Sequence, residues 1–240
     1  MIKNFADIKR NEIKLFGGKA ANLAFLMQNG FNVPDGFCIS TQINEIDKET
    51  EKEIIKQYKN LKSKVSVRSS ATVEDAKNAS FAGQFDTFLN IHSEKTLLKA
   101  INDCWKSANS SRAKSYSENK NIKNARMAVI VQKMIDADFA GVIFSLDPIY
   151  KKHLLIEVVK GLGDKLVSGE VTPNTYFLDR KNFQIARKEI QFQFNEAPLI
   201  KLSKIALEIE KLYKSPQDIE FCIKSGKIYI LQSRPITTLN

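Results

Sequence analysis

The pattern of apolar segments changes along the chain, and this change limits the folds that it can adopt. In the first half, short strand-like segments such as KVSVRSSA (64–71) are separated by helical stretches, the longest covering about residues 94–118. The second half is richer in strand-like segments, with glycine- and turn-rich stretches between them and one amphipathic helix over about residues 199–213. Strands and helices do not alternate strictly, so the pattern predicts the α+β class.

A polar stretch at residues 119–126 separates the two patterns and predicts a boundary in the chain. We therefore expect an N-terminal subdomain over residues 1–120 and a C-terminal subdomain over residues 121–240. A chain of this length can bury a sizeable core as one large domain or as two small ones.

The composition is that of a folded, soluble protein, with 43% apolar and 27% charged residues. No apolar run approaches the roughly 20 residues that span a bilayer, and the N-terminal segment lacks the apolar core of a signal peptide. We therefore expect a cytoplasmic protein with no membrane partner. The first residues fit a natural N-terminus, and the C-terminal end fits either a natural end or the boundary of a domain excised from a longer enzyme.

Cysteine and histidine chemistry is restricted by the small number of these residues and by their positions. Cys38, Cys104 and Cys222 lie far apart in apolar patterns without a CxxC motif, which argues against a disulfide framework or a zinc site. His92 follows an apolar segment and His153 lies in a lysine-rich turn, so neither has the neighbours of a catalytic histidine. We expect buried cysteines and structural or exposed histidines.

The chain is basic, because 37 lysines and arginines outnumber 27 aspartates and glutamates and leave a formal charge of +10. This charge is spread along helix faces and loops, as on a solvated surface, but it also favours attraction to a polyanion. Charge alone does not separate a nucleic acid from a nucleoside triphosphate. Basic and aromatic residues are not interleaved as in nucleic-acid-binding modules, so we expect no nucleic-acid partner.

The tripeptide Gly17-Gly18-Lys19 stands at the start of a predicted helix, GGKAANLAFLMQNG. Glycines let the backbone approach a ligand closely, the amide groups of a helix start favour an anion, and Lys19 adds a positive charge. The spacing is not that of a Walker A motif. Taken alone, the tripeptide indicates an ordinary tight loop before a helix rather than a phosphate site.

Two further segments carry groups that suit a bound phosphate. Arg68 ends an otherwise small and apolar strand, where it needs either a phosphate or an internal carboxylate as its partner. These two alternatives are equally supported. The segment SFAGQFDT (80–87) combines Gly83, where the backbone can approach a ligand, with neutral hydrogen-bonding groups. It fits either a flexible flap over phosphates or a plain β-turn.

The C-terminal segment DIEFCIKSGKIYILQ predicts a β-hairpin around Ser225-Gly226. A two-residue loop places Glu220 opposite Leu231, whereas a longer loop or a glycine bulge pairs Glu220 with Gln232. In the second register one face carries Glu220, Cys222, Ile230, Gln232 and Arg234, and the other carries Phe221, Ile223, Tyr229 and Leu231.

The second register groups a carboxylate, an amide and a guanidinium at one end of one face. The oxygens of Glu220 and Gln232 suit Mg²⁺, which keeps other coordination positions for water and phosphate. Arg234 would neutralise a phosphate beside them. An arginine–glutamate ion pair on an edge hairpin is the alternative. The metal site is favoured, because Gln232 adds nothing to an ion pair.

Five segments, taken in order, resemble the ATP-binding domain shared by pyruvate phosphate dikinase, phosphoenolpyruvate synthase and rifampicin phosphotransferase. They cover well over half of the chain, and the combination of VRSSAT, ED, FAGQ-DT and DIE…LQSRP is specific. The detailed sequence is most similar to the rifampicin phosphotransferase and phosphoenolpyruvate synthase branch. The segments are GGKAANLAFLMQNGFNVPDGFCIST, VSVRSSATVEDAKNASFAGQFDTFLNI, AVIVQKMIDADFAGVIFSLDP, GLGDKLVSGEVTPNTYFLD and PQDIEFCIKSGKIYILQSRPITT.

The resemblance implies an ATP-grasp fold, in which two α+β halves clamp ATP, with ATP and Mg²⁺ as cofactors. It also implies phosphoryl transfer by positioning and charge neutralisation, with catalytic roles for Lys19, Arg68 and Arg234. The implied nucleotide-binding positions are Lys19 and Arg68 at the phosphates, Gly83, Gln84, Asp86 and Thr87 in a loop over them, Gln132, Lys133 and Met134 at the adenine, Glu220 and Gln232 as ligands of Mg²⁺, and Arg234 at the transferring phosphoryl group.

The chain also departs from this family. The segment between FCIST and KVSVRSS is short, and Asp164-Lys165 replaces a glutamate followed by a small residue, which weakens a ligand role for Asp164. Nothing in the chain resembles the phosphohistidine swivel domain or the acceptor-binding domain of full-length relatives. We therefore expect an ATP-dependent phosphotransferase component that passes a phosphoryl or pyrophosphoryl group to a histidine on a separate swivelling domain or partner protein. A non-catalytic ATP-binding regulatory subunit is the alternative.

Overall fold

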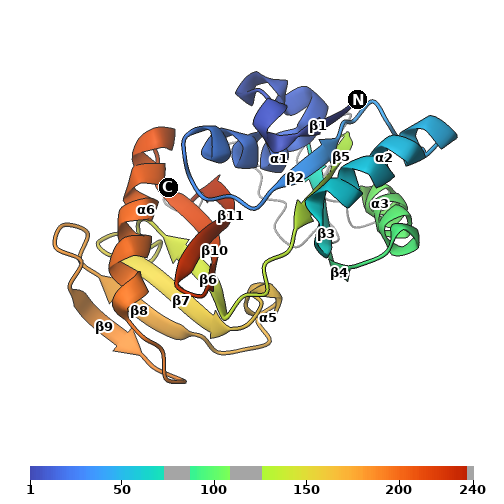
Figure 1. Cartoon of the computed structure of the whole chain (residues 1–240). Helices are drawn as coiled ribbons and strands as arrows, with labels where there is room; N and C mark the ends of the chain where they lie inside the picture. The colour runs from blue at the N-terminus through green and yellow to red at the C-terminus, as the bar shows by residue number, and fades with distance from the viewer. Residues whose placement is uncertain (73–86, 109–125, 237–240) are drawn as a thin grey trace. The chain divides into compact units, whose positions relative to one another are not determined.

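The computed structural model describes residues 1–72, 87–108 and 126–236 of the chain, which forms two compact units, Met1–Met134 and Ile135–Asn240 (Figure 1). The division falls later than the boundary expected near residue 120. The reason is strand β5 (Met127–Lys133), which was expected in the C-terminal subdomain but pairs with two strands of the first unit.

The first unit is built on a five-stranded antiparallel sheet in the order β1-β2-β5-β3-β4. Segments rich in valine and isoleucine form its centre, because β-branched side chains pack well on a pleated, buried surface. The remaining strands of this sheet are β1 (Ile2–Asn4), β2 (Gly36–Ile39), β3 (Val65–Ala71) and β4 (Thr87–Ile91).

The apolar core of the first unit lies between one face of this sheet and two helices, α2 (Lys48–Leu61) and α3 (Glu94–Ala108). Helix α2 is shorter than the segment 43–62 predicted for it, because Asp47 caps its start by accepting the N–H of Thr50. The part of the long helix predicted beyond residue 108 lies outside the described residues. The core includes Ile54, Val65, Val67, Leu97, Ile101, Cys104, Val129 and Val131.

The opposite face of β3 carries Ser66, Arg68 and Ser70, because side chains alternate between the two faces of a strand. Helix α1 (Ile13–Gln28) packs against β3 and β5 on this side, after the 3₁₀ turns η1 (Phe5–Asp7) and η2 (Arg10–Glu12). Gly17 interrupts α1 with φ 75° and ψ 168°, so the regular helix begins again after it. Arg68, which is expected near phosphates, therefore lies on the face that α1 covers.

The second unit is built on a six-stranded antiparallel sheet in the order β11-β10-β6-β7-β8-β9. All the strands predicted after residue 135 are present, and a short helix, α5 (Asp164–Val167), follows β7. The strands are β6 (Phe139–Phe144), β7 (Leu154–Lys160), β8 (Asn174–Leu178), β9 (Ile185–Glu189), β10 (Gln217–Lys224) and β11 (Lys227–Pro235).

Helix α6 (Ala197–Tyr213) packs on β6 and β10 (Figure 1). Ser145, directly after β6, donates a hydrogen bond to Glu210 of α6, which identifies the face that the helix covers. Because side chains alternate, Ile143 and its cross-strand partner Ile219 belong to that face. The opposite face of β10 carries Asp218, Glu220 and Cys222.

The expectation for the cysteines is confirmed, since Cys38, Cys104 and Cys222 are free and buried. Burial raises the pKa of the Cys222 thiol to about 12, so this side chain stays protonated at neutral pH. His92 is exposed, with its Nδ1 2.9 Å from the carbonyl oxygen of Asn90. Among the helices described, none combines the length and the apolar character needed to cross a lipid bilayer.

Candidate functional site

The glycine-rich residues 17–20 and the end of β3 meet, although they are far apart in sequence. Ala20 N–H donates a hydrogen bond to Ser70 Oγ at 3.2 Å. A Cβ atom on Gly17 would lie 2.3 Å from both the carbonyl oxygen and the Oγ of Ser70, and its φ of 75° also favours glycine. The expected tight loop is present, and it packs directly on the segment that follows Arg68.

Lys19 and Arg68 belong to this junction, and both are partly buried. Lys19 Nζ donates to the carbonyl oxygen of Ser69 at 3.4 Å, one residue along β3 from Arg68. The structure therefore brings together the two segments of the first unit that carry the expected phosphate-binding cations.

The loop expected over the phosphates is described only at its end. Thr87 is exposed at the start of β4, opposite Arg68 in the ladder between β3 and β4. Gly83, Gln84 and Asp86 lie outside the described residues. A covering role for these four residues stays a prediction.

The three residues expected at the adenine lie at the end of β5 and of the first unit. Gln132 is 2% exposed, and its Nε2 donates to the carbonyl oxygen of Pro34 at 3.1 Å. The backbone N–H groups of Lys133 and Met134 donate to carbonyl oxygens of neighbouring loops at 2.8 and 2.9 Å. These bonds fix the backbone of the segment, and its contact with adenine stays a prediction.

The hairpin of β10 and β11 combines features of both registers considered for it. Its turn has two residues, Ser225-Gly226, with φ of 48° and 74°. A bulge between Glu220 and Phe221 then shifts the pairing, so that Glu220 lies opposite Gln232. The expected pairing is confirmed, but a bulge away from the turn produces it.

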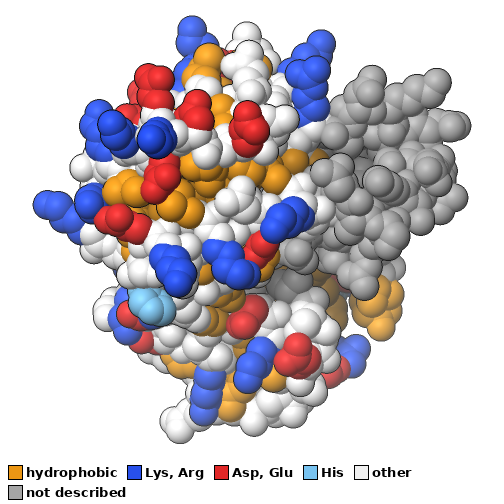
Figure 2. All heavy atoms as spheres, turned by 90° about the vertical axis from the view of Figure 1, so that its right-hand side faces the viewer, with side chains coloured by type: hydrophobic (Ala, Val, Ile, Leu, Met, Phe, Trp, Pro, Cys, Tyr) orange, Lys and Arg blue, Asp and Glu red, His pale blue; other side chains and the backbone are white. Residues whose placement is uncertain are grey.

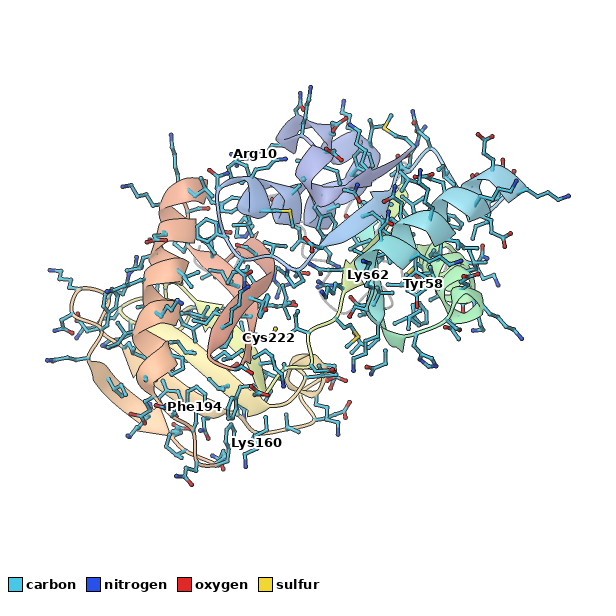
Figure 3. All side chains as sticks on the ribbon, viewed as in Figure 1. Arg10, Tyr58, Lys62, Lys160, Phe194 and Cys222 are labelled. Atoms are coloured by element: carbon cyan, nitrogen blue, oxygen red, sulfur yellow. The ribbon has the colours of Figure 1, made fainter. Side chains whose placement is uncertain are left out.

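The bulge changes how side chains group on the two faces of the hairpin. Between the turn and the bulge, Cys222 pairs with Tyr229 and Phe221 pairs with Ile230. The prediction that Ile230 shares the face of Glu220, and that Tyr229 lies on the other face, is therefore wrong. The physical reason is that the extra residue on β11 reverses the alternation of its side chains. Cys222, labelled in Figure 3, lies two residues from Glu220 on β10.

Arg234 lies directly across from Asp218 in the same hairpin. Its Nε donates to Asp218 Oδ2 at 2.8 Å, and Nη2 is 2.7 Å from the same oxygen. Burial raises the pKa of Asp218, which is 8% exposed; the charge of Glu220 adds to this rise and Arg234 opposes it. Sequence reasoning missed Asp218, although its place two residues before Glu220 puts both on one face of the strand.

A third carboxylate, Glu157 of β7, belongs to this face. Glu220 pairs with Val142 of β6, and Val142 in turn pairs with Glu157. Burial raises the pKa of Glu157, and the charge of Asp218 raises it further. Sequence reasoning also missed this residue; the available signal was a lone glutamate inside the apolar strand HLLIEVV.

Magnesium fits the donor set of this face. Mg²⁺ binds to one or two protein carboxylates and completes its coordination with water and phosphate oxygens. Glu220 and Gln232, on directly opposed positions, supply a carboxylate and an amide oxygen. The described part of the chain contains no group of three or more His, Cys, Asp or Glu residues arranged to hold a metal. Water and substrate oxygens would complete the coordination.

Comparison with known protein families gives an independent finding. The sequence model described as "Pyruvate phosphate dikinase, AMP/ATP-binding domain" matches residues 42–197 and 188–240. A probable phosphoenolpyruvate synthase from Archaeoglobus fulgidus is 36% identical, over 98% of this chain and 41% of that protein. A rifampicin phosphotransferase from Bacillus cereus is 31% identical, over 99% of this chain and 36% of that protein. The chain thus spans less than half the length of these curated relatives.

Solved structures give the fold. D-Alanine-D-alanine ligase from Helicobacter pylori aligns with a TM-score of 0.51 and 12% identity, over 95% of this chain and 56% of that chain. A dinucleotide-forming acetyl-coenzyme A synthetase from Ca. Korarchaeum cryptofilum aligns with a TM-score of 0.51 and 12% identity, over 90% of both chains. Both are ATP-grasp proteins, so the expected ATP-grasp fold is confirmed.

Proposed function

Because the chain belongs to the pyruvate phosphate dikinase AMP/ATP-binding domain family, we propose that it is the ATP-using part of a phosphotransferase. It would bind ATP with Mg²⁺ and pass a phosphoryl or pyrophosphoryl group to a histidine on a swivelling domain or a separate partner protein. That partner would also bind the final acceptor, which would be pyruvate, phosphate, water or an antibiotic hydroxyl.

The observation that carries this proposal is the junction between residues 17–20 and residues 68–70. Phosphoryl transfer depends on neutralising and aligning the phosphates rather than on a protein nucleophile. Lys19 offers a compact positive charge, and Arg68 offers a planar set of donors that matches phosphate oxygens. The hydrogen bond from Lys19 Nζ to Ser69 O ties these two cationic segments together within one unit.

Glu220 and Gln232 of the second unit would hold the Mg²⁺. When bound, the metal would supply positive charge to the phosphate oxygens and help to align them. Asp218 and Glu157 add two further carboxyl groups to this face of the sheet. A cation between these carboxyl groups and the phosphates would favour binding, so this arrangement supports the magnesium complex of ATP as the bound form.

Arg234 would contact the phosphoryl group as it transfers. Its guanidinium is held by one oxygen of Asp218 at 2.8 and 2.7 Å, so its position is constrained before the nucleotide arrives. Donors that are already oriented need little reorganisation as charge develops in the transition state. Arg234 would stabilise that charge, and Asp218 would orient Arg234.

A nucleotide is favoured over a nucleic acid as the anionic partner, because basic and aromatic residues are not interleaved in the sequence. On the face drawn in Figure 2, lysines and arginines are interspersed with aspartates and glutamates. A nucleic-acid-binding domain instead gathers its basic residues into a patch or stripe.

Transfer of labelled phosphate tests the proposal. The chain would be incubated with Mg²⁺, ATP labelled at the β or γ position, and a histidine-carrying swivel domain of the same family as substrate. Acid-labile label on the swivel domain is expected, and label from the β position would indicate transfer of a pyrophosphoryl group. Lys19→Ala should abolish the labelling.

Two other outcomes would count against this role. Tight binding of MgATP without transfer to any swivel domain tested would favour a non-catalytic ATP-binding regulatory subunit. Failure of the chain to bind MgATP in a calorimetric titration would reject both functions.

A further inference from the structure

Ser70 completes the start of the regular helix in α1 from a different element of the fold. The first N–H groups of a helix have no acceptor within the helix itself. After the interruption at Gly17, one of these groups, Ala20 N–H, donates to Ser70 Oγ at 3.2 Å. Ala20 and Ser70 are both 0% exposed, so solvent does not reach this bond. The hydroxyl of Ser70 therefore satisfies a buried amide.

Two further contacts join the same short segments. Ser69, next to Ser70, accepts a hydrogen bond from Lys19 Nζ through its carbonyl oxygen at 3.4 Å. Gly17 packs so closely on Ser70 that any side chain there would collide with it. Neighbouring residues of β3 thus hold neighbouring residues of α1, beside Arg68.

We propose that Ser70 is a positioning residue of the nucleotide site. It sets where residues 17–20 lie on β3, and thereby where Lys19 presents its ammonium group relative to Arg68. This inference rests on the proposed function, because it takes Lys19 as a phosphate ligand. Ser70 acts on the nucleotide through Lys19, so its loss should weaken binding of the phosphates and spare the nucleoside.

Ser70→Ala and Ser107→Ala form a matched pair for the test. Ser107 of α3 is also buried, and its Oγ donates to the carbonyl oxygen of Cys104 at 2.8 Å, on the face of the sheet opposite α1. Each variant would be titrated calorimetrically with MgATP and with adenosine. Ser70→Ala should lower the affinity for MgATP about tenfold, which is the upper range for the loss of one hydrogen bond. It should change the affinity for adenosine by less than about twofold. Ser107→Ala should change both affinities by less than about twofold.

Hydrogen exchange provides a second readout. Ser70→Ala should speed the exchange of the Ala20 amide and leave that of Leu26, near the other end of α1, unchanged. If Ser70→Ala does not fold, Ser70→Cys replaces it, because a thiol has a similar shape but accepts hydrogen bonds weakly. The same selective loss of MgATP affinity is expected from that variant.

The inference is overturned if the Ser70 variant binds MgATP like the wild type, or loses MgATP and adenosine to the same extent. Lys19→Ala separates this failure from that of the proposed function. If Lys19→Ala binds MgATP normally, the phosphate role of Lys19 and the inference fail together. If Lys19→Ala weakens MgATP and the Ser70 variant does not, the inference alone fails.

Discussion

Two nitrogen atoms of Arg234 lie within hydrogen-bonding distance of a single oxygen of Asp218, with Nε at 2.8 Å and Nη2 at 2.7 Å. The two residues occupy opposed positions in the hairpin, so the backbone ladder holds them in register. Two donors on one acceptor hold that edge of the guanidinium against the carboxylate.

Breaking this pair should destabilise the chain, because the remaining group is left in a poorly hydrated position. Asp218→Ala and Arg234→Ala should each lower the free energy of unfolding by about 2 kcal/mol. This loss of stability is smaller than that expected for a fully buried ion pair, because 29% of the Arg234 side chain is exposed. The double variant should lose less than the sum, with a coupling of about 1 kcal/mol. Urea unfolding of the wild type, the two single variants and the double variant measures the coupling. Strictly additive losses of stability would contradict the prediction.

Glu220→Gln should lower the affinity for MgATP by at least about tenfold. Loss of a group that merely orients a metal ligand already lowers metal affinity by about tenfold or more, and loss of the ligand itself should cost at least as much. Chelating the Mg²⁺ should lower the affinity of the wild type to that of the variant. Glu208→Gln, at an exposed position on α6, serves as the control. Calorimetric titrations with and without EDTA provide the measurement. A variant that retains the full magnesium dependence of the wild type would exclude Glu220 as a ligand.

Gly17→Ala should destabilise the chain far more than Gly30→Ala. Both glycines have positive φ, 75° and 84°, which costs a non-glycine residue about 1–2 kcal/mol. At Gly30 no atom lies within 4 Å of an added Cβ, whereas at Gly17 the Cβ would meet Ser70 at 2.3 Å. We expect a loss of about 3 kcal/mol or more for Gly17→Ala. Thermal unfolding compares the two variants, and equal losses would mean that the contact with Ser70 is loose.

Asp138→Asn should make stability less dependent on pH. Hydrogen bonds from Lys224 Nζ and from the N–H of Ser225, both 2.7 Å, hold the pKa of Asp138 below its ordinary value. A lowered folded-state pKa gives stability that is complete above the unfolded pKa of about 3.9 and is lost as the pH falls through the folded value. The variant should therefore melt earlier than the wild type at neutral pH. As the pH falls through the lowered folded-state pKa of Asp138, the melting temperatures of the two chains should converge. A difference in melting temperature that is the same at all pH values would contradict this role of Asp138.

The hairpin illustrates how far its sequence determines its structure. Ser225-Gly226 predicts the turn, and the alternation of apolar residues predicts both strands. The register depends on where an extra residue is accommodated, and local composition does not decide between the turn and a point farther along β11. Only the paired backbone shows that the bulge lies beside Phe221.

The candidate site was predictable where one segment carries the signal. Lys19, Arg68, Glu220 and Gln232 each lie in a recognisable motif. The contact of residues 17–20 with Ser70 joins segments separated by 50 residues, so no local pattern contains it. The division between the two units lies later than the expected boundary for the same reason, because the partners of β5 are set by tertiary pairing.

The bulge beside Phe221 has a practical consequence for engineering the chain. It absorbs the odd residue of the hairpin, so the tip can be shortened or lengthened by whole cross-strand pairs while Gln232 stays opposite Glu220. Adding a single residue on one side would instead turn the amide to the other face. The tip is therefore a place to graft a loop or a label, provided that residues are added or removed in opposed pairs.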